Sequence, residues 1–324
     1  MPFGIGGGND YIGKIMKGEK VSLGTRLVEG ILQLHGRLPL AYHRWWARRV
    51  AWLLGSVLHY RRDVVITNLS RSFPRKSYEQ IQEIARRFYL HLSTVFTEMI
   101  WFGACKDEKG RKRFVKSGIC RMTNPEEMNR ILDASKQTML LQCHTGNWEL
   151  IGGIIQTSVN PPLHMEASAI SVTYRPLSSR MWDTIMHHNR IGLVRDQGFD
   201  GYLATDNVLR FVLGNKDRKY TYVFITDQHP YTGNGAAEVT FMHQKTGTVT
   251  AAAHLACKLD MAVAYLRITE REEGGYDLTA VPITDHAAGQ DPVKIMEKYY
   301  ELLEEDLENQ PWNYLWSHKR WKVY

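Results

Sequence analysis

The spacing of apolar residues divides the chain into two parts. From about residue 25 to 108, apolar side chains recur at the three- and four-residue intervals of amphipathic helices. From about residue 109 to 324, short apolar runs alternate with helical segments, which is typical of an α/β fold with a mostly parallel sheet. We therefore predict a mostly parallel mixed sheet flanked by helices. It belongs to a single domain of residues 25–324, which follows a flexible Gly-rich tail of residues 1–24.

Individual elements follow from the same pattern. In the helical part, Ser77 followed three residues later by Gln80 predicts a capped helix running towards Phe102. In the second part, apolar runs predict strands over 138–143, 169–174, 220–226, 262–268 and 276–281. Helices are predicted over 147–157, 178–190, 201–214, 247–258 and 292–308.

One predicted helix, from about Leu40 to Tyr60, combines aromatic and basic side chains. Trp45 and Trp46 fall on its broad apolar face, and Arg44 and Arg48 lie on the flank of that face. Such a helix is typical of a segment lying on an anionic membrane surface, although a core-packing helix with a basic edge has the same pattern. The longest apolar run, residues 50–58, is about half the ~20 residues that a spanning helix needs. We predict an N-terminal membrane-associating segment and no membrane span.

Composition narrows the class of protein. The 324 residues include 41 Lys and Arg against 34 Asp and Glu, a net charge of +7, and 44% are hydrophobic, which excludes a disordered chain. The four cysteines form no Cys-x-x-Cys pair, so we expect reduced thiols rather than a metal site. The first residues show no signal-peptide pattern, so we expect a cytoplasmic protein. The basic charge comes without a nucleic-acid motif, and we expect no nucleic-acid partner.

The strongest candidate chemistry lies where a predicted strand runs into a helix. His144 follows the strand over 138–143, and Glu149 falls in the first turns of the next predicted helix. A carboxylate that accepts the Nδ1–H of His144 raises the basicity of Nε2 and makes it a general base for a hydroxyl. We predict this dyad as the catalytic pair, with Asn147 or Thr145 capping the helix, whose N–H groups offer positive potential to an anion. A buried structural histidine is the alternative.

Polar side chains also follow other predicted strands. Arg175 follows the strand over 169–174 and is suited to holding a phosphate. Asp227 follows the strand over 220–226, where it orients either Arg175 or the His144 dyad, or caps a turn. His187 and His188 point about 100° apart on one helix. A metal-dependent hydrolase built from them and Asp227 is a further alternative.

Several of these segments together resemble the late lipid A acyltransferase family, of the lauroyl/myristoyl transferase type. The resemblance spans about residue 25 to 324. Its pieces are Arg62 with Asn68-Leu and Ser72-Phe-Pro74, Glu98, His144-Thr-Gly-Asn-Trp-Glu149-Leu, Tyr174-Arg-Pro176, Arg190-Ile-Gly192, Asp227-Gln228, and the block Pro311-Trp-Asn-Tyr-Leu-Trp-Ser-His-Lys-Arg-Trp-Lys322. The resemblance implies a glycerolphosphate-acyltransferase-like fold of the superfamily that carries a His-x4-Asp/Glu motif.

The resemblance also implies a reaction and its partners. The fatty acyl chain would pass from acyl carrier protein, as co-substrate, to a hydroxyl of a lipid A precursor, at the cytoplasmic face of the inner membrane. His144 and Glu149 map to the catalytic pair, and Arg175, Asp227, Asn147 and Arg190 are the candidate substrate-binding residues. No metal or other cofactor is expected. Another glycolipid or aminolipid as acceptor, or a non-catalytic lipid-binding relative, remains open.

Overall fold

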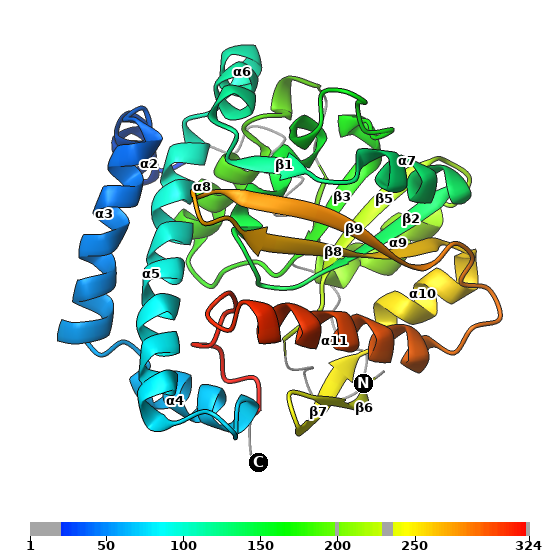
Figure 1. The fold of residues 1–324 in the computed structure, drawn as a ribbon. Helices are drawn as coiled ribbons and strands as arrows, with labels where there is room; N and C mark the ends of the chain where they lie inside the picture. Colours follow the sequence, from blue (N-terminus) through cyan, green and yellow to red (C-terminus); the bar gives the residue numbers. More distant parts are fainter. Residues whose placement is uncertain (1–20, 198–200, 229–235, 322–324) are drawn as a thin grey trace, which may run out of the picture.

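The computed structural model describes residues 21–197, 201–228 and 236–321 (Figure 1), so most of the predicted tail of residues 1–24 lies outside the described residues. The helical part contains α2 (Leu23–Gly36), α3 (Leu40–Trp52), the π-helix η1 (Leu53–Val57), α4 (Arg62–Ser72) and α5 (Tyr78–Gly103). The predicted start of α5 is confirmed, because the Ser77 hydroxyl accepts from the Gln80 backbone and the Gln80 side chain returns to the Ser77 N–H. α2 and α3 lie on the outer side of α5, at the left of Figure 1.

The helix predicted over Leu40–Tyr60 forms as two consecutive helices. α3 runs to Trp52, and η1 continues it to Val57 with the wider turns of a π-helix. Within the described residues, no helix is both long and apolar enough to cross a bilayer.

The second part of the chain forms a seven-stranded mixed sheet in the order β1-β9-β8-β2-β5-β3-β4. The strands are β1 (Cys120–Met122), β2 (Gln137–Gln142), β3 (Ile170–Tyr174), β4 (Tyr202–Ala204), β5 (Tyr220–Ile225), β8 (Ala262–Glu270) and β9 (Tyr276–Thr284). Every neighbouring pair is parallel except β8 with β9, so the predicted mostly parallel mixed sheet is confirmed. β5 is inserted between β2 and β3, and this order decides which strand ends meet.

Helices cover both faces of this sheet (Figure 1). They are α6 (Asp107–Ser117), α7 (Pro125–Ala134), the 3₁₀-helices η2 (Trp148–Thr157), η3 (Ala167–Ala169), η4 (Arg195–Gln197) and η5 (Thr205–Asn207), α8 (Arg180–Ile191), α9 (Val208–Gly214), α10 (Ala251–Leu259) and α11 (Pro292–Asn309). Along β2, Met139 and Leu141 pack into the core that includes α10 and α11, whereas Leu140 packs into the core that includes η2 and α7. Because each face of β2 is covered, all of its residues are buried, as expected for a central parallel strand.

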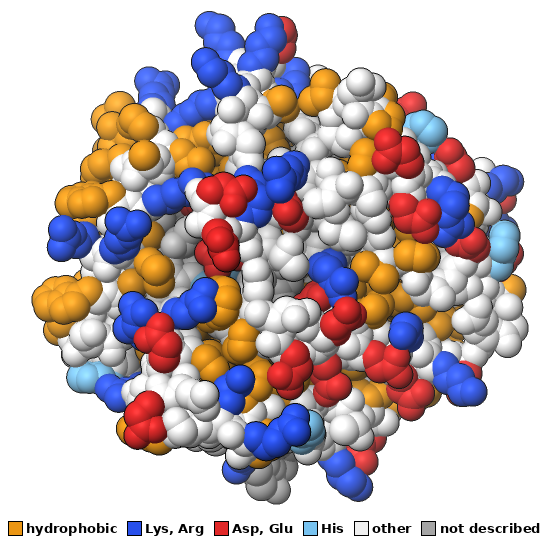
Figure 2. Space-filling model, viewed as in Figure 1, with side chains coloured by type: hydrophobic (Ala, Val, Ile, Leu, Met, Phe, Trp, Pro, Cys, Tyr) orange, Lys and Arg blue, Asp and Glu red, His pale blue; other side chains and the backbone are white. Residues whose placement is uncertain are grey.

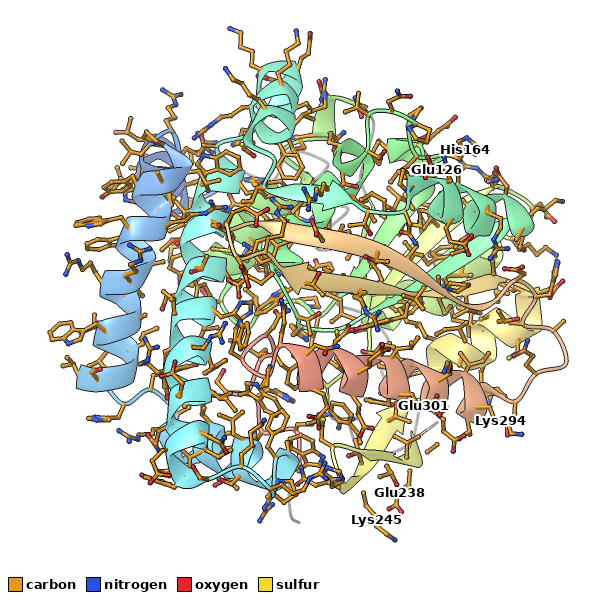
Figure 3. The ribbon with its side chains drawn as sticks, viewed as in Figure 1. Glu126, His164, Glu238, Lys245, Lys294 and Glu301 are labelled. Carbon is orange, nitrogen blue, oxygen red and sulfur yellow. The ribbon has the colours of Figure 1, made fainter. Side chains whose placement is uncertain are left out.

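Two segments differ from the prediction. The segment over 201–214, predicted as one helix, begins with the edge strand β4 and becomes α-helical only from Val208. Part of the segment predicted as a helix over 247–258 belongs to a separate antiparallel hairpin of β6 (Ala236–Phe241) and β7 (Gln244–Val249). β4 is only three residues long and β7 is mostly polar, so neither carries much apolar periodicity. Lys245 and Glu238 form an ion pair across this hairpin, at the bottom of Figure 3.

Candidate functional site

The site is built where two neighbouring parallel strands end. β2 pairs with β5 in the register Gln142 to Ile225, and His144 and Asp227 each lie two residues beyond these positions. Because the register continues past the strand ends, the two side chains meet at the carboxyl edge of the sheet, where α/β proteins place their sites. The Nδ1 of His144 lies 2.8 Å from Oδ1 of Asp227.

The turn after His144 is held by close backbone packing. Gly146 has φ +56°, and a side chain there would collide with Ile268. Glycine is therefore required both by the backbone conformation and by the available space. The Gly146 N–H donates a hydrogen bond to Oδ1 of Asn313, 2.5 Å away, from the C-terminal block of the chain. This contact fixes the turn on which His144 sits.

Asp227 is suited to orienting the imidazole as an anion. Its side chain is buried, whereas that of His144 keeps 15% exposure. Burial disfavours the charged form of Asp227, but the attraction of His144, the hydrogen bond from it and the more distant Arg320 outweigh burial and lower its pKa. An ionised Asp227 accepts the hydrogen of Nδ1 and leaves the lone pair on Nε2. The amide nitrogen of Gln228, an exposed residue, lies 3.3 Å from this Nε2.

The predicted hydrogen bond between His144 and Glu149 is wrong. Glu149 receives two hydrogen bonds from Arg190, at 2.7 and 2.8 Å, and a third from the indole N–H of Trp148, at 3.1 Å. η2 directs Glu149 towards α8 rather than back to the strand end, and Nδ1 of His144 is taken by Asp227. Burial alone would raise the pKa of Glu149, but Arg190 above all, with smaller effects of His144 and Trp148, holds it below its ordinary value.

Glu149 nevertheless belongs to the same site. The Trp148 ring, whose N–H donates to Glu149, lies edge-on to the His144 ring with 5.2 Å between centroids. Arg190 also lies over the Tyr202 ring, 5.7 Å from its centroid. The site thus holds two carboxylates with separate partners, Asp227 on the imidazole and Glu149 on a guanidinium. Of the predicted substrate-binding residues, Asp227 and Arg190 join the two proposed catalytic residues here.

A second polar cluster lies behind the turn. Asn147 does not cap η2 with its side chain, because its amide donates to Oε2 of Glu98 on α5, 3.2 Å away. Glu98 also accepts from the Tyr276 hydroxyl at 2.9 Å and from Nε of Arg44 at 3.0 Å. Burial raises the pKa of Glu98, against the opposing effects of Arg44, Tyr276 and Asn147. The guanidinium of Arg44 therefore faces the protein, whereas it was predicted to face a membrane.

The remaining candidates are Arg175 and the two adjacent histidines of α8. Arg175 follows β3 at the same edge of the sheet, with an exposed side chain. His188 contacts Glu29 at 3.2 Å, and burial lowers the pKa of His187 to about 4. Within the described residues, no three His, Cys, Asp or Glu side chains are grouped as metal ligands. The alternative metal site of His187, His188 and Asp227 is therefore not formed.

Sequence reasoning assigned no role to three residues of this site: Gln228, Asn313 and Trp148. All three lie within segments that carry the family resemblance, which is the signal that could have identified them. Their contacts with His144, Gly146 and Glu149 join segments distant in the sequence or depend on how η2 winds. Residue spacing along the chain does not reveal such contacts.

We predict that Gly152→Ala destabilises the fold around the Glu149–Arg190 pair. A methyl group on Gly152 in η2 would collide with the backbone carbonyl of Arg190 on α8, so the two helices must separate. Overpacking of this kind costs about 1–3 kcal/mol of unfolding free energy, measured by urea denaturation. The matched control is Gly214→Ala, because nothing lies within 4 Å of the added methyl group. Equal stability of both variants would contradict the tight packing of η2 on α8.

Known proteins resemble this chain along most of its length. The model of a bacterial lipid A biosynthesis acyltransferase family matches residues 20–323. The chain is 24% identical over 298 residues to the lipid A biosynthesis palmitoleoyltransferase of Escherichia coli strain K12, covering 91% of this chain and 89% of that protein. The same identity and coverage relate it to a lipid A biosynthesis acyltransferase of Shigella flexneri. The family match spans the sheet, the His144 turn and α8, and on this evidence the chain belongs to the bacterial lipid A biosynthesis acyltransferase family.

Proposed function

We propose that this protein transfers a fatty acyl chain from acyl carrier protein to a hydroxyl of a lipid A precursor. The observation that carries the proposal is the 2.8 Å hydrogen bond between Nδ1 of His144 and the buried Asp227, at the carboxyl edge of the sheet. An imidazole held in this way has one nitrogen available as a general base. The family match supplies the substrate class, since its description is lipid A biosynthesis.

The proposed reaction is a direct acyl transfer. Nε2 of His144 takes the proton of the acceptor hydroxyl as the oxygen attacks the thioester carbonyl carbon. The new C–O bond forms, the C–S bond breaks, and the thiolate of the carrier leaves. The imidazolium then returns its proton to that sulfur. Asp227 stabilises the imidazolium while it exists. Every step moves a proton or an acyl group, so the proposal invokes no metal or redox cofactor.

Negative charge develops on the thioester oxygen during the attack. The buried ion pair of Glu149 and Arg190 fixes the start of η2, whose first N–H groups, at Trp148 and Glu149, are the proposed stabilising donors. Glu149 thus assists catalysis by placing these groups, and its proposed partner is Arg190 rather than His144. Asn147, held by Glu98, anchors the same turn from behind. Exposed Arg175, at the same sheet edge, is the proposed contact for a phosphate of the acceptor or of the phosphopantetheine arm.

The proposed mode of membrane association is peripheral, at the cytoplasmic face of the inner membrane. Trp45 and Trp46 on α3 are 47% and 40% exposed, and Arg48 is exposed beside them. Exposed indole rings and guanidinium groups favour the anionic surface of a bilayer. Arg44 is left out of this docking surface because it is bound to Glu98. The net charge of +7 would also favour encounter with the acidic carrier protein.

A transfer assay with product analysis tests the proposed function. The purified protein is incubated with a mixture of acyl carrier protein thioesters, lipid A precursor and total membrane lipid, and the lipids are identified by mass spectrometry. We expect the precursor to gain the mass of one acyl chain, and carrier protein without an acyl group to yield no product. If another glycolipid or an aminolipid gains the acyl chain instead, that lipid is the acceptor. No thioester consumption would support a non-catalytic lipid-binding relative.

A further inference from the structure

A basic pocket lies beside α2 and is separate from the His144 site. It has a volume of about 310 Å³ and lies between the end of α2 and the start of α6. Four cationic side chains line it, Arg37, Lys106, Lys109 and Arg113, against the single carboxylate of Asp107. Figure 2 shows Lys and Arg side chains gathered over α6, the helix that carries Lys109 and Arg113, at the top of the molecule. The excess of positive charge predicts an anionic ligand.

Two of the four cations are tied to the protein. Arg113 donates to the carbonyls of Gly36 and Leu38, both at 2.9 Å, and lies over the Trp101 ring. Lys106 lies 3.6 Å from Glu29. These contacts hold the pocket in shape. The carboxylate of Asp107 accepts hydrogen bonds from the N–H groups of Lys109 and Gly110. It therefore occupies two N–H groups in the first turn of α6, and the ligand would contact side chains.

The other two cations face solvent. Arg37 and Lys109 are exposed, and no hydrogen bond or ion pair of their side chains is found among the described residues. A guanidinium and an ammonium group around a small pocket are the usual partners of a phosphate. The volume is at the lower end of the range for ligand pockets, so it suits a headgroup rather than an acyl chain.

The surface next to the pocket identifies the kind of phosphate. Leu38, 38% exposed, follows the end of α2, and the helix itself carries an exposed ridge of large aliphatic side chains, between 59% and 84% exposed: Leu23, Leu27, Ile31 and Leu34. These positions lie three or four residues apart and so share one face of the helix. Leu34 and Leu38 are direct chain neighbours of Gln33 and Arg37, which line the pocket. Figure 2 shows hydrophobic side chains gathered at the upper left, where α2 lies in Figure 1.

We propose that this pocket binds the phosphate of an anionic glycerophospholipid while the α2 ridge enters the acyl layer. The apolar side chains of α2, next to the exposed cations, fit a lipid better than an acidic protein, which would bind through charge without needing the ridge. The proposal rests on the membrane docking of the proposed function and adds a lipid-selective site to it. The site would orient α2, α3 and the entrance to the sheet edge on the bilayer.

Vesicle binding of two matched charge variants tests the site. The pocket variant is Arg37→Ser with Lys109→Ser, and the control is Lys258→Ser with Lys294→Ser on α10 and α11. Lys294 lies at the far end of α11 from α2 (Figure 3). Both variants lose two positive charges from exposed positions. Binding is measured by cosedimentation with phosphatidylcholine vesicles, with and without a fraction of phosphatidylglycerol.

We expect the pocket variant to bind phosphatidylglycerol vesicles about tenfold or more weakly than wild type, and the control about twofold or less. Binding to pure phosphatidylcholine should be equal for all three proteins, because the ridge is unchanged. Equal losses in both variants, or no loss in the pocket variant, would overturn the site. So would a pocket variant that keeps vesicle binding but loses binding to acyl carrier protein.

Two further measurements identify the ligand and separate this site from the proposed function. Calorimetric titration compares inorganic phosphate with a short-chain, soluble phosphatidylglycerol, and we expect only the lipid to bind well. Equal affinity for inorganic phosphate would overturn the lipid assignment. The transfer assay is run on wild type with detergent-dispersed acceptor, without vesicles. A wild-type protein that is inactive there but binds the vesicles as expected contradicts the proposed function and leaves the lipid site supported.

Discussion

His144→Ala is expected to lower the rate of acyl transfer about 10³-fold, because the acceptor hydroxyl then loses its general base. The imidazole is the group at this sheet edge that can take a proton and return it to the leaving thiolate, with Asp227 2.8 Å away to stabilise its charged form. The measurement is kcat for one acyl carrier protein thioester and one lipid acceptor. Since only proton transfer is removed, kcat should fall far more than the KM for either substrate rises.

The variant and its control must be shown to be folded. His144→Ala leaves the buried Asp227 without its partner, so His144→Gln, which keeps a donor near that carboxylate, is measured beside it. The matched control is His164→Ala. His164 also contacts an aspartate, with 2.7 Å between its Nδ1 and Oδ2 of Asp133, but it is half exposed, and Asp133 lies on α7, which precedes β2, whereas His144 follows β2. Near-normal turnover of folded His144→Ala would rule out the proposed mechanism.

Asp227→Asn is expected to lower kcat about 10³-fold relative to wild type, although the general base His144 is still present. The neutral amide no longer stabilises an imidazolium and can hold the ring in the wrong tautomer. Its side chain is buried and nearly isosteric with the aspartate, so the fold should be kept. The rate and its pH profile are measured together. A kcat within a few-fold of wild type would assign Asp227 a structural role.

The stability of this variant should depend on pH in a defined direction. The pKa of Asp227 is lower in the folded protein than its ordinary value near 4, so its ionised form stabilises the fold. That contribution is complete above the unfolded pKa and is lost as the pH falls through the lower folded pKa. Wild type should therefore exceed Asp227→Asn in unfolding free energy at neutral pH, and the difference should shrink below about pH 4.

Glu149→Gln tests whether the role of Glu149 differs from that of Asp227. It leaves the guanidinium of Arg190 largely buried beside a neutral amide, a loss that costs about 3–5 kcal/mol of stability in comparable buried pairs. Activity should fall as well, because the start of η2 is no longer fixed. In a double-mutant cycle, Glu149→Gln and Arg190→Gln should show a strong coupling energy in unfolding. Additive effects would contradict the pairing of these two residues.

The architecture explains why the two carboxylates have different partners. Asp227 reaches His144 because β5 lies beside β2 in the sheet, although about 80 residues, including β3 and β4, separate them in the chain. Glu149 is five residues from His144, but η2 turns its side chain towards α8. The order of the strands, rather than nearness in the sequence, therefore decided which carboxylate pairs with His144.

The helical part also differs from its prediction where a contact joins distant segments. The amphipathic pattern of residues 40–60 correctly indicated a helix with exposed Trp45 and Trp46, because periodicity reports which side chains share a face. It placed Arg44 and Arg48 together on the membrane side. The packing of α3 against α5 instead brings Arg44 within 3.0 Å of buried Glu98. A buried carboxylate needs a cation, and only the fold shows which of several arginines is within reach.

The sequence by itself determined the helix and strand periods, the capped start of α5, the mostly parallel sheet and the positions of His144 and Asp227 at strand ends. These features depend on residue type and on spacing within one segment, and both can be read directly from the sequence. The tertiary structure alone decided that Asp227 holds His144, that Arg190 holds Glu149 and that the α2 ridge adjoins a basic pocket. Each of these pairings joins distant segments, and they are set by strand order and helix packing rather than by local pattern.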